Sequence, residues 1–202
     1  ISSSALYVPA SSPYNSFREL IAAAKAKPGS INFGTWGAGS VPDIVAKYVN
    51  NQMGVEMALI PYKGAQPGLM AILANEIQIT YFGIGPLLPQ MRAGKVKLLA
   101  ATSDKRLWNF PDLPTVAEGG YAGYTSGAWY AVVTRAGTPR PVVERLNREI
   151  NTLLARADVK VSLEKDGFII DGGGSPADTA AFIAAEIKKW AVLTREAGAK
   201  FD

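Results

Sequence analysis

The feature that most constrains the fold is a repeated alternation of short apolar strands and amphipathic helices in the first half of the chain. The expected strands cover 5–8, 31–34, 55–60, 77–81 and 96–101, and the expected helices cover 16–26, 41–53, 67–74 and 87–93. Such alternation predicts an α/β fold with a mainly parallel sheet and helices on both faces. Ligands of such sheets bind at the carboxyl ends of the strands.

A glycine-rich turn follows the second expected strand. It reads Thr35-Trp36-Gly37-Ala38-Gly39-Ser40, and Asp43 lies three residues beyond Ser40. Ser40 is typical of a helix N-cap, and an acid three residues later is typical of a capping box. Unpaired N–H groups and a partial positive charge at the helix start favour an anion. The alternative, a βα connection without a ligand, has equal weight from the residues alone.

Composition excludes several kinds of chemistry. The 202 residues include no Cys and no His, which excludes disulfides, the usual zinc sites, Cys nucleophiles and His bases, and we predict no cofactor. The formal net charge of +4 is spread along the chain, so nucleic-acid binding is not expected. The pair Gly37 and Gly39 leaves a dinucleotide-binding enzyme as an alternative, weakened because Pro42 stands where that fingerprint needs a third glycine.

The second half of the chain has few expected strands. We expect a long loop over 104–123, strands at 128–134 and 168–170, a helix capped by Thr138, and a final helix from Ser175 to Gly198. The indoles of Trp129 and Trp190 are expected in the core. The first of these helices is expected to bury Val142, Val143, Leu146, Ile150, Leu153 and Leu154. Because so few strands are available to cover these helices, we expect exposed apolar faces, and either self-association or cover from a further N-terminal segment.

Four ordered motifs resemble the Bug receptors, the periplasmic solute-binding proteins of tripartite tricarboxylate transporters. The motifs are Gly34-Thr35-x-Gly37-x-Gly39-Ser40, Pro61-Tyr62-Lys63-Gly64-x-x-Pro67, Lys105-Arg106 with Pro111-Asp112-Leu113-Pro114-Thr115-Val116-Ala117-Glu118, and Ala136-Gly137-Thr138-Pro139. The resemblance runs from about Ala5 to the C-terminus.

The resemblance implies a two-lobed Venus flytrap like the type II periplasmic binding proteins. Residues 5–128 would form one complete βα lobe, the family's second. Residues 129–202 would form the C-terminal part of the other lobe, whose N-terminal βα units lie outside this sequence. The start at Ile1, without Met or signal peptide, is expected for a mature or trimmed product.

The implied function is non-enzymatic. The receptor would capture a small organic carboxylate in the periplasm and deliver it to a membrane permease. A flytrap-type ligand-sensing or regulatory domain is the main alternative.

Two positions depart from the family pattern. Phe82 stands where many members have Asp, and Asp43 stands where many have His. An Asp would pair with a ligand amine or hydroxyl, whereas Phe82 offers an apolar wall, so we expect an aromatic compound or a dicarboxylate rather than an amino acid. The predicted ligand-binding residues are Thr35, Trp36, Gly37, Gly39, Ser40, Lys63, Gly64, Ala65 and Phe82.

Overall fold

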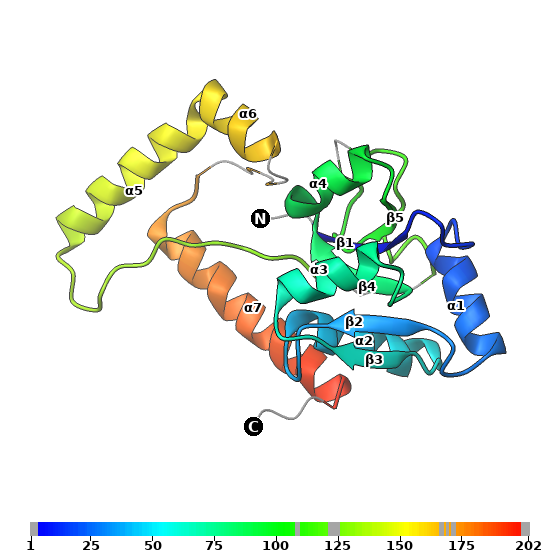
Figure 1. The fold of residues 1–202 in the computed structure, drawn as a ribbon. Helices are drawn as coiled ribbons and strands as arrows, with labels where there is room; N and C mark the ends of the chain where they lie inside the picture. The colour runs from blue at the N-terminus through cyan, green and yellow to red at the C-terminus, as the bar shows by residue number, and fades with distance from the viewer. Residues whose placement is uncertain are drawn as a thin grey trace.

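A five-stranded sheet forms the centre of the larger part of the molecule (Figure 1). The computed structural model describes residues 4–107, 110–120, 126–165, 168, 170 and 173–198. The strands are β1 (Ser4–Pro9), β2 (Asn32–Thr35), β3 (Ala58–Pro61), β4 (Ile79–Gly83) and β5 (Val96–Ala101), in the spatial order β3-β2-β4-β1-β5. We call residues 4–107 and 110–120 the sheet lobe. The five strands expected in the first half of the chain are all present, with shifts of a few residues at their ends.

Two pairs of helices cover the two faces of this sheet. They are α1 (Phe17–Ala26), α2 (Val41–Met53), α3 (Ala65–Leu73) and α4 (Ile84–Arg92). In β1, Leu6 packs in a core cluster with α1 and α2 residues, while Tyr7 packs in a second cluster with residues of α3 and α4. This is the alternation expected of a strand buried on both faces.

The first strand is the exception to the parallel arrangement. β2 pairs parallel with β3 and β4, whereas β1 pairs antiparallel with both β4 and β5, with Ser4 opposite Gly83. The start of β1 therefore lies at the same edge as the ends of β2 and β4. This places Ser4 beside the residues that follow β2 and β4, at the edge where ligands of such sheets bind.

The C-terminal third of the chain forms an arm that extends from the sheet lobe (Figure 1). The arm consists of residues 129–134 and the helices α5 (Arg140–Ala155), α6 (Ala157–Lys165) and α7 (Pro176–Glu196). The strand predicted over 128–134 was wrong. Only Ala128 forms a bridge, and 129–134 run extended beside the helices with no sheet to join. The prediction that Thr138 caps α5 was also wrong, because its hydroxyl donates to the Arg135 carbonyl and Pro139 is the N-cap.

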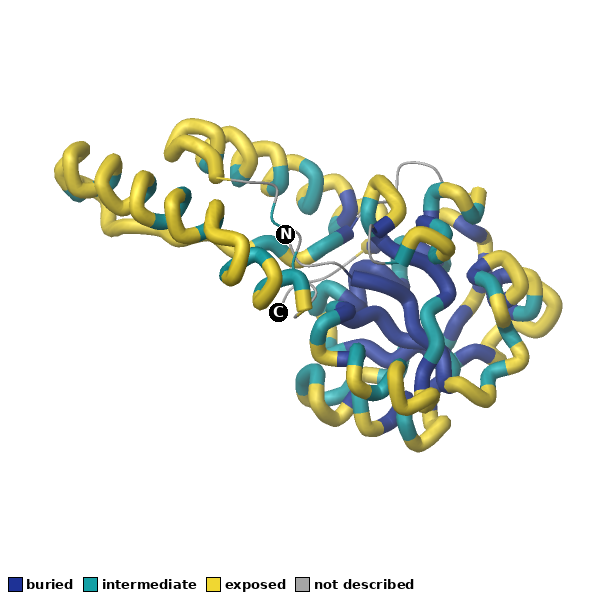
Figure 2. Tube along the Cα trace, turned by 90° about the horizontal axis from the view of Figure 1, so that it is seen from above, coloured by how far each residue is buried: buried dark blue, intermediate teal, exposed yellow. Residues whose placement is uncertain are grey.

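The arm is mostly exposed, in contrast to the buried sheet (Figure 2). The prediction that α5 buries its apolar face was wrong, since none of its residues is buried and Val142, Leu146 and Leu153 are 46%, 43% and 47% exposed. Sequence periodicity correctly gave an apolar face, but α6 and α7, which contact α5, leave it only partly covered. The strand expected at 168–170 is reduced to a bridge at Phe168, because Ile170 forms no ladder and residue 169 lies outside the described residues.

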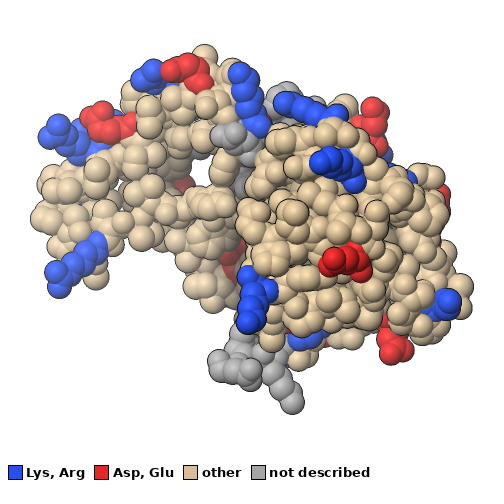
Figure 3. Space-filling model, viewed as in Figure 1, with Lys and Arg blue, Asp and Glu red and all other residues tan. Residues whose placement is uncertain are grey.

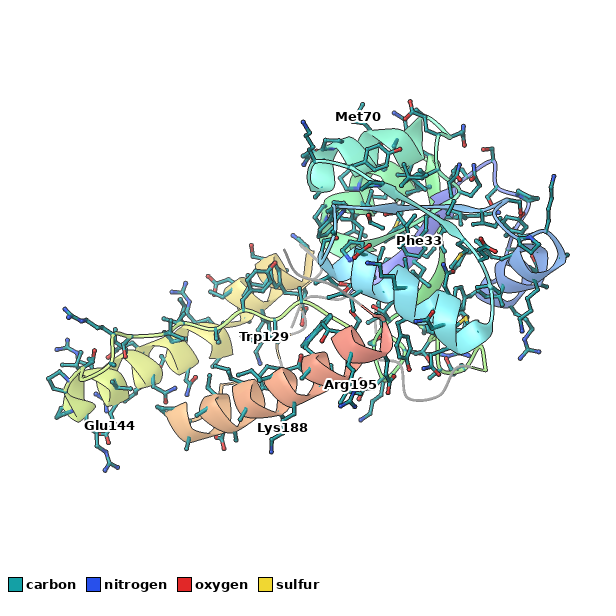
Figure 4. The ribbon with its side chains drawn as sticks, turned by 90° about the horizontal axis from the view of Figure 1, so that it is seen from below. Phe33, Met70, Trp129, Glu144, Lys188 and Arg195 are labelled. Carbon is teal, nitrogen blue, oxygen red and sulfur yellow. The ribbon has the colours of Figure 1, made fainter. Side chains whose placement is uncertain are left out.

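The end of α7 returns to the sheet lobe. Leu193 and Ala197 pack on Ile44 of α2, and the Asn51 side-chain amide donates to the Glu196 carbonyl over 2.8 Å. Trp129 and Trp190 are half-buried rather than core residues. Trp129 lies on the extended segment beside α7 (Figure 4), and Trp190 belongs to α7.

Candidate functional site

A cleft of about 510 Å³ opens at the edge of the sheet where β2 and β4 end. It lies between the sheet lobe and the start of the arm. Its lining consists of Ser4, Trp36, Val41, Tyr81, Phe82, Gly83, Gly85, Pro86, Gly127, Ala128, Tyr130 and Phe168. This is the edge at which α/β proteins bind ligands, and the volume is typical of a small-molecule site.

A second hollow, of about 630 Å³, lies between α4 and α6. Its lining consists of Leu88, Met91, Arg92, Phe110, Val161, Glu164 and Lys165. None of the nine predicted ligand-binding residues is among them, and the hollow does not lie at the carboxyl edge of the strands. We therefore place the candidate site in the smaller cleft.

The glycine turn, residues 36–40, joins β2 to α2. Gly37 and Gly39 have φ values of +99° and +74°, which only glycine adopts without strain. Ser40 is the N-cap of α2, as predicted. Its Oγ donates to the Gly37 carbonyl over 2.7 Å and accepts from the N–H groups of Trp36 and Asp43 at 3.3 and 3.4 Å.

The amides of the glycine turn are only partly available to a ligand. The Gly39 N–H donates to Asp43 Oδ2 over 2.9 Å, and the Ser40 N–H donates to the Gly37 carbonyl over 3.2 Å. The N–H groups of Gly37 and Ala38 form no hydrogen bond with any described residue. The buried Asp43 carboxylate, which Lys47 pairs at 2.9 Å, thus occupies part of the expected anion site.

Residues 62–64, which join β3 to α3 within the second sequence motif, lie beside the glycine turn. The Tyr62 N–H donates to the Thr35 carbonyl over 2.9 Å, and Gly64 has a φ of +101° just before α3. Thr35 is buried, Gly64 and Ala65 are half-buried, and the Lys63 side chain is exposed. Of the nine predicted residues, only Trp36 and Phe82 line the cleft. Thr35, Gly37, Gly39, Ser40, Lys63, Gly64 and Ala65 lie around it without forming its surface.

Trp36 and Phe82 form one wall of the cleft. Their ring centroids are 5.2 Å apart at an interplanar angle of 73°, an edge-to-face contact. The buried Trp36 Nε1 has no hydrogen-bond partner among the described residues, and it lies against α3 near Gly68, where a Cβ would come within 3.7 Å of it. A Cβ at this position would be in ordinary van der Waals contact with the indole, which shows that Trp36 packs directly on α3.

Several lining residues were missed by the sequence prediction. The hydroxyl groups of Tyr81 and Ser126 share a hydrogen bond of 3.0 Å. Burial raises the pKa of the Tyr81 phenol above its ordinary value, and the hydrogen bond to Ser126 partly opposes this rise. Gly83 ends β4 and Gly85 lies in the first turn of α4, and neither was among the predicted site residues. Tyr130 and Phe168 come from distant parts of the chain, and nothing local in their sequence places them here.

The electrostatics of the cleft come from the backbone rather than from charged side chains. No charged side chain belongs to the described lining. Gly83, the N-cap of α4, provides no side chain to cap that helix, so the first N–H groups of α4 face the edge that carries the cleft. On the face drawn in Figure 3, acidic and basic side chains are scattered over both the sheet lobe and the arm.

No group of three or more Cys, His, Asp or Glu side chains that could hold a metal ion occurs among the described residues. None of the helices over those residues is long and apolar enough to cross a membrane.

Comparison with known proteins adds to this geometry. BugT of Bordetella pertussis is 33% identical over 188 residues, which cover 92% of this chain and 57% of BugT. The chain thus spans little more than half of that relative. Two solved structures from Rhodopseudomonas palustris are also similar. One is Rpa4515 with adipate, with 31% identity, a TM-score of 0.88, and coverage of 98% of this chain and 66% of the other. The second is MatC with bound malate, with 26% identity, a TM-score of 0.80, and coverage of 95% and 66%.

These similarities confirm the predicted fold class. The sheet lobe and the arm match part of a type II periplasmic-binding-protein-like flytrap, with one complete βα lobe and one incomplete lobe. The matched proteins are receptors rather than enzymes, which agrees with the non-enzymatic prediction. The family model described as "Tripartite tricarboxylate transporter family receptor" matches residues 1–199, and the chain therefore belongs to this receptor family.

Proposed function

We propose that this chain is part of a periplasmic receptor that captures a small organic carboxylate and delivers it to the permease of a tripartite tricarboxylate transporter. The observation that carries the proposal is the cleft at the sheet edge, which Trp36 of the glycine turn and residues at the starts of α2 and α4 line. Backbone N–H groups at helix N-termini are suited to bind an anion. Adipate and malate in the similar structures are both carboxylates.

The two available amides of the glycine turn suggest how the carboxylate binds. The N–H groups of Gly37 and Ala38 would donate to one carboxylate oxygen, and the start of α4 would attract the anion from the other side of the cleft. The Gly39 N–H would join only if Asp43 released it. Of the four backbone N–H groups of residues 37–40, only those of Gly37 and Ala38 are thus available in this conformation.

The division of the chain supports a site between two lobes. Residues 5–128 would supply the edge of the sheet, and residues 129–202 would supply Tyr130 and Phe168 as part of the other lobe. Because the relatives are longer than this chain, further ligand contacts would come from parts of the receptor outside it.

A thermal-shift screen of the full-length receptor tests the carboxylate assignment. A ligand that binds only the native state stabilises it by about 2.7 kcal/mol at a concentration of 100 times Kd. We expect stabilisation by adipate, malate or benzoate, and none by the matched neutral amides. Equal shifts for the acids and their amides, or stabilisation by dinucleotides alone, would contradict the proposal.

Delivery requires a separate test, because a sensing domain would bind the same ligand. We expect the ligand-loaded receptor to bind the purified permease in a pull-down, and the unloaded receptor to bind more weakly. Carboxylate binding without any permease binding would favour the regulatory alternative.

A further inference from the structure

Two aromatic pairs from different parts of the molecule line the same cleft. Trp36 and Phe82 come from the sheet edge, and Tyr130 and Phe168 come from the arm side. The rings of Tyr130 and Phe168 are also edge-to-face, with centroids 5.5 Å apart and an interplanar angle of 60°. With Tyr81, five of the twelve lining residues are aromatic.

The two pairs differ in burial. Phe82 is only 6% exposed, so its pair with Trp36 is a wall that is already packed. Tyr130 is 73% exposed. A large ring that lines a cleft yet remains in water still has most of its apolar surface to bury. A ligand between the pairs would cover this surface.

The chemistry of the lining restricts the ligand's body. A ligand ammonium would lose hydration here without meeting a carboxylate among the described lining residues, so an amino acid is disfavoured. An aliphatic chain would gain only from burial. An aromatic ring gains in addition from edge-to-face contacts with rings 4.5–7 Å away, at about 0.5–1.5 kcal/mol per pair, or roughly 2- to 12-fold in affinity.

We infer that the cleft is a subsite for the aromatic ring of the ligand, held between the Trp36–Phe82 pair and the Tyr130–Phe168 pair. Combined with the proposed carboxylate function, on which this part rests, the favoured ligand class is an aromatic carboxylate. The arm thereby contributes to specificity through Tyr130, whose ring would turn from solvent onto the ligand.

Isothermal titration of the full-length receptor with benzoate and cyclohexanecarboxylate provides the test. These acids have the same number of carbons and one carboxylate each, and they differ in the aromaticity of the ring. We expect benzoate to bind roughly 2- to 12-fold more tightly, the range that corresponds to one aromatic contact.

Tyr130→Ala tests the arm's part directly, because Tyr130 lines the cleft, and circular dichroism of the full-length variant establishes that it is folded. We expect this variant to weaken benzoate binding and bring the ratio of the two affinities toward one, with little effect on cyclohexanecarboxylate. Val132→Ala is the matched control, since Val132 is 72% exposed on the same segment but does not line the cleft.

The outcomes separate the two proposals. Equal affinity for the two acids, or no effect of Tyr130→Ala on benzoate, would overturn the ring subsite and leave the carboxylate function standing. Binding of benzyl alcohol with no binding of either acid would overturn the carboxylate function and support the ring subsite. If none of the three compounds binds, both proposals fail.

Discussion

Trp129 and Trp190 are linked through a single carboxylate oxygen. Both indole Nε1–H groups donate to Glu186 Oε2, over 3.2 Å and 3.1 Å, and Lys189 pairs with the other oxygen at 2.7 Å. Trp129 lies on the extended segment that leaves the cleft, and Trp190 lies on α7 (Figure 4). The Trp129 ring also meets Phe182 edge-to-face at 5.5 Å. Glu186 therefore attaches the segment that carries Tyr130 to the helix that returns to the sheet lobe.

Glu186→Ala should destabilise the chain by about 1–3 kcal/mol, because it leaves two partly buried indole donors without their acceptor. Urea unfolding followed by tryptophan fluorescence measures this. Lys189→Ala is the control that removes only the ion pair, and it should cost less than about 1 kcal/mol because the lysine is about one-third exposed. An equal cost for the two variants would show that the indoles do not depend on Glu186.

The exposed apolar face of the arm should make this chain self-associate when it is produced alone. Ile187 is 65% exposed on α7, and α5 exposes three large aliphatic side chains. Light scattering after size-exclusion chromatography should show mass increasing with concentration, and a Leu146→Lys and Leu153→Lys double variant should reduce it. A Met70→Lys variant controls for added charge, because Met70 is 64% exposed at the outer side of α3, away from the arm (Figure 4). A monomer at every concentration would contradict this prediction.

The sheet lobe could be predicted because its signals are local. Apolar periodicity, the stop at Gly54 and the N-cap at Ser40 locate α2 and its neighbours within a few residues. The antiparallel direction of β1 could not be predicted, since the pairing of Leu6 with Tyr81 and Ala100 joins distant segments. The site was predicted only in part for the same reason. Trp36 follows β2 and Phe82 lies near the end of β4, and both strand ends could be located from the sequence, whereas Tyr130 reaches the cleft through the path of the arm.

The burial of the arm was predicted wrongly for a different reason. Residues such as Val142 and Leu146 follow a helical period that marks an apolar face. The period specifies which side chains share the face, but it does not specify whether another element covers them. Burial therefore depends on residues that lie elsewhere in the fold, and for α5 the described residues of α6 and α7 cover only part of the face.

The glycine turn should tolerate change at Ser40 better than at Gly39. Gly39→Val places a β-branched residue at a φ of +74° and should both destabilise the turn and weaken carboxylate binding. Ser40→Ala should cost about 1 kcal/mol of stability, because it removes the helix cap. Chemical unfolding and titration with benzoate measure the two effects. Full carboxylate affinity in a folded Gly39→Val variant would exclude the turn from the site.

The start of α7 should weaken in acid. Asp178 Oδ2 accepts from the Ser175 hydroxyl and N–H over 2.7 and 2.8 Å, and these bonds lower the pKa of the Asp178 carboxyl below its usual value of 3.8. Because the folded-state pKa is the lower one, this stabilisation is present above about pH 4 and is lost as the pH falls through the folded-state pKa. Helicity measured from pH 6 to 2 should fall less steeply in Asp178→Asn, which has no carboxyl to protonate. Identical acid profiles would contradict the role of this cap.

Asp43 should limit how strongly the glycine turn binds an anion. Its carboxylate occupies the Gly39 N–H and places a negative charge at the start of α2, where a ligand carboxylate would lie. Asp43→Asn keeps an oxygen that can accept from Gly39 but removes the charge. It should therefore raise the affinity for benzoate about 2- to 5-fold, the equivalent of about 0.5–1 kcal/mol for a charge at a helix terminus.

The exposed Asp112, changed to Asn, is the matched control because it alters the net charge equally away from the turn. Circular dichroism establishes that both variants are folded before titration. Equal gains in the two variants would assign the effect to net charge, and weaker binding in Asp43→Asn would show that Asp43 organises the turn for the ligand rather than competing with it.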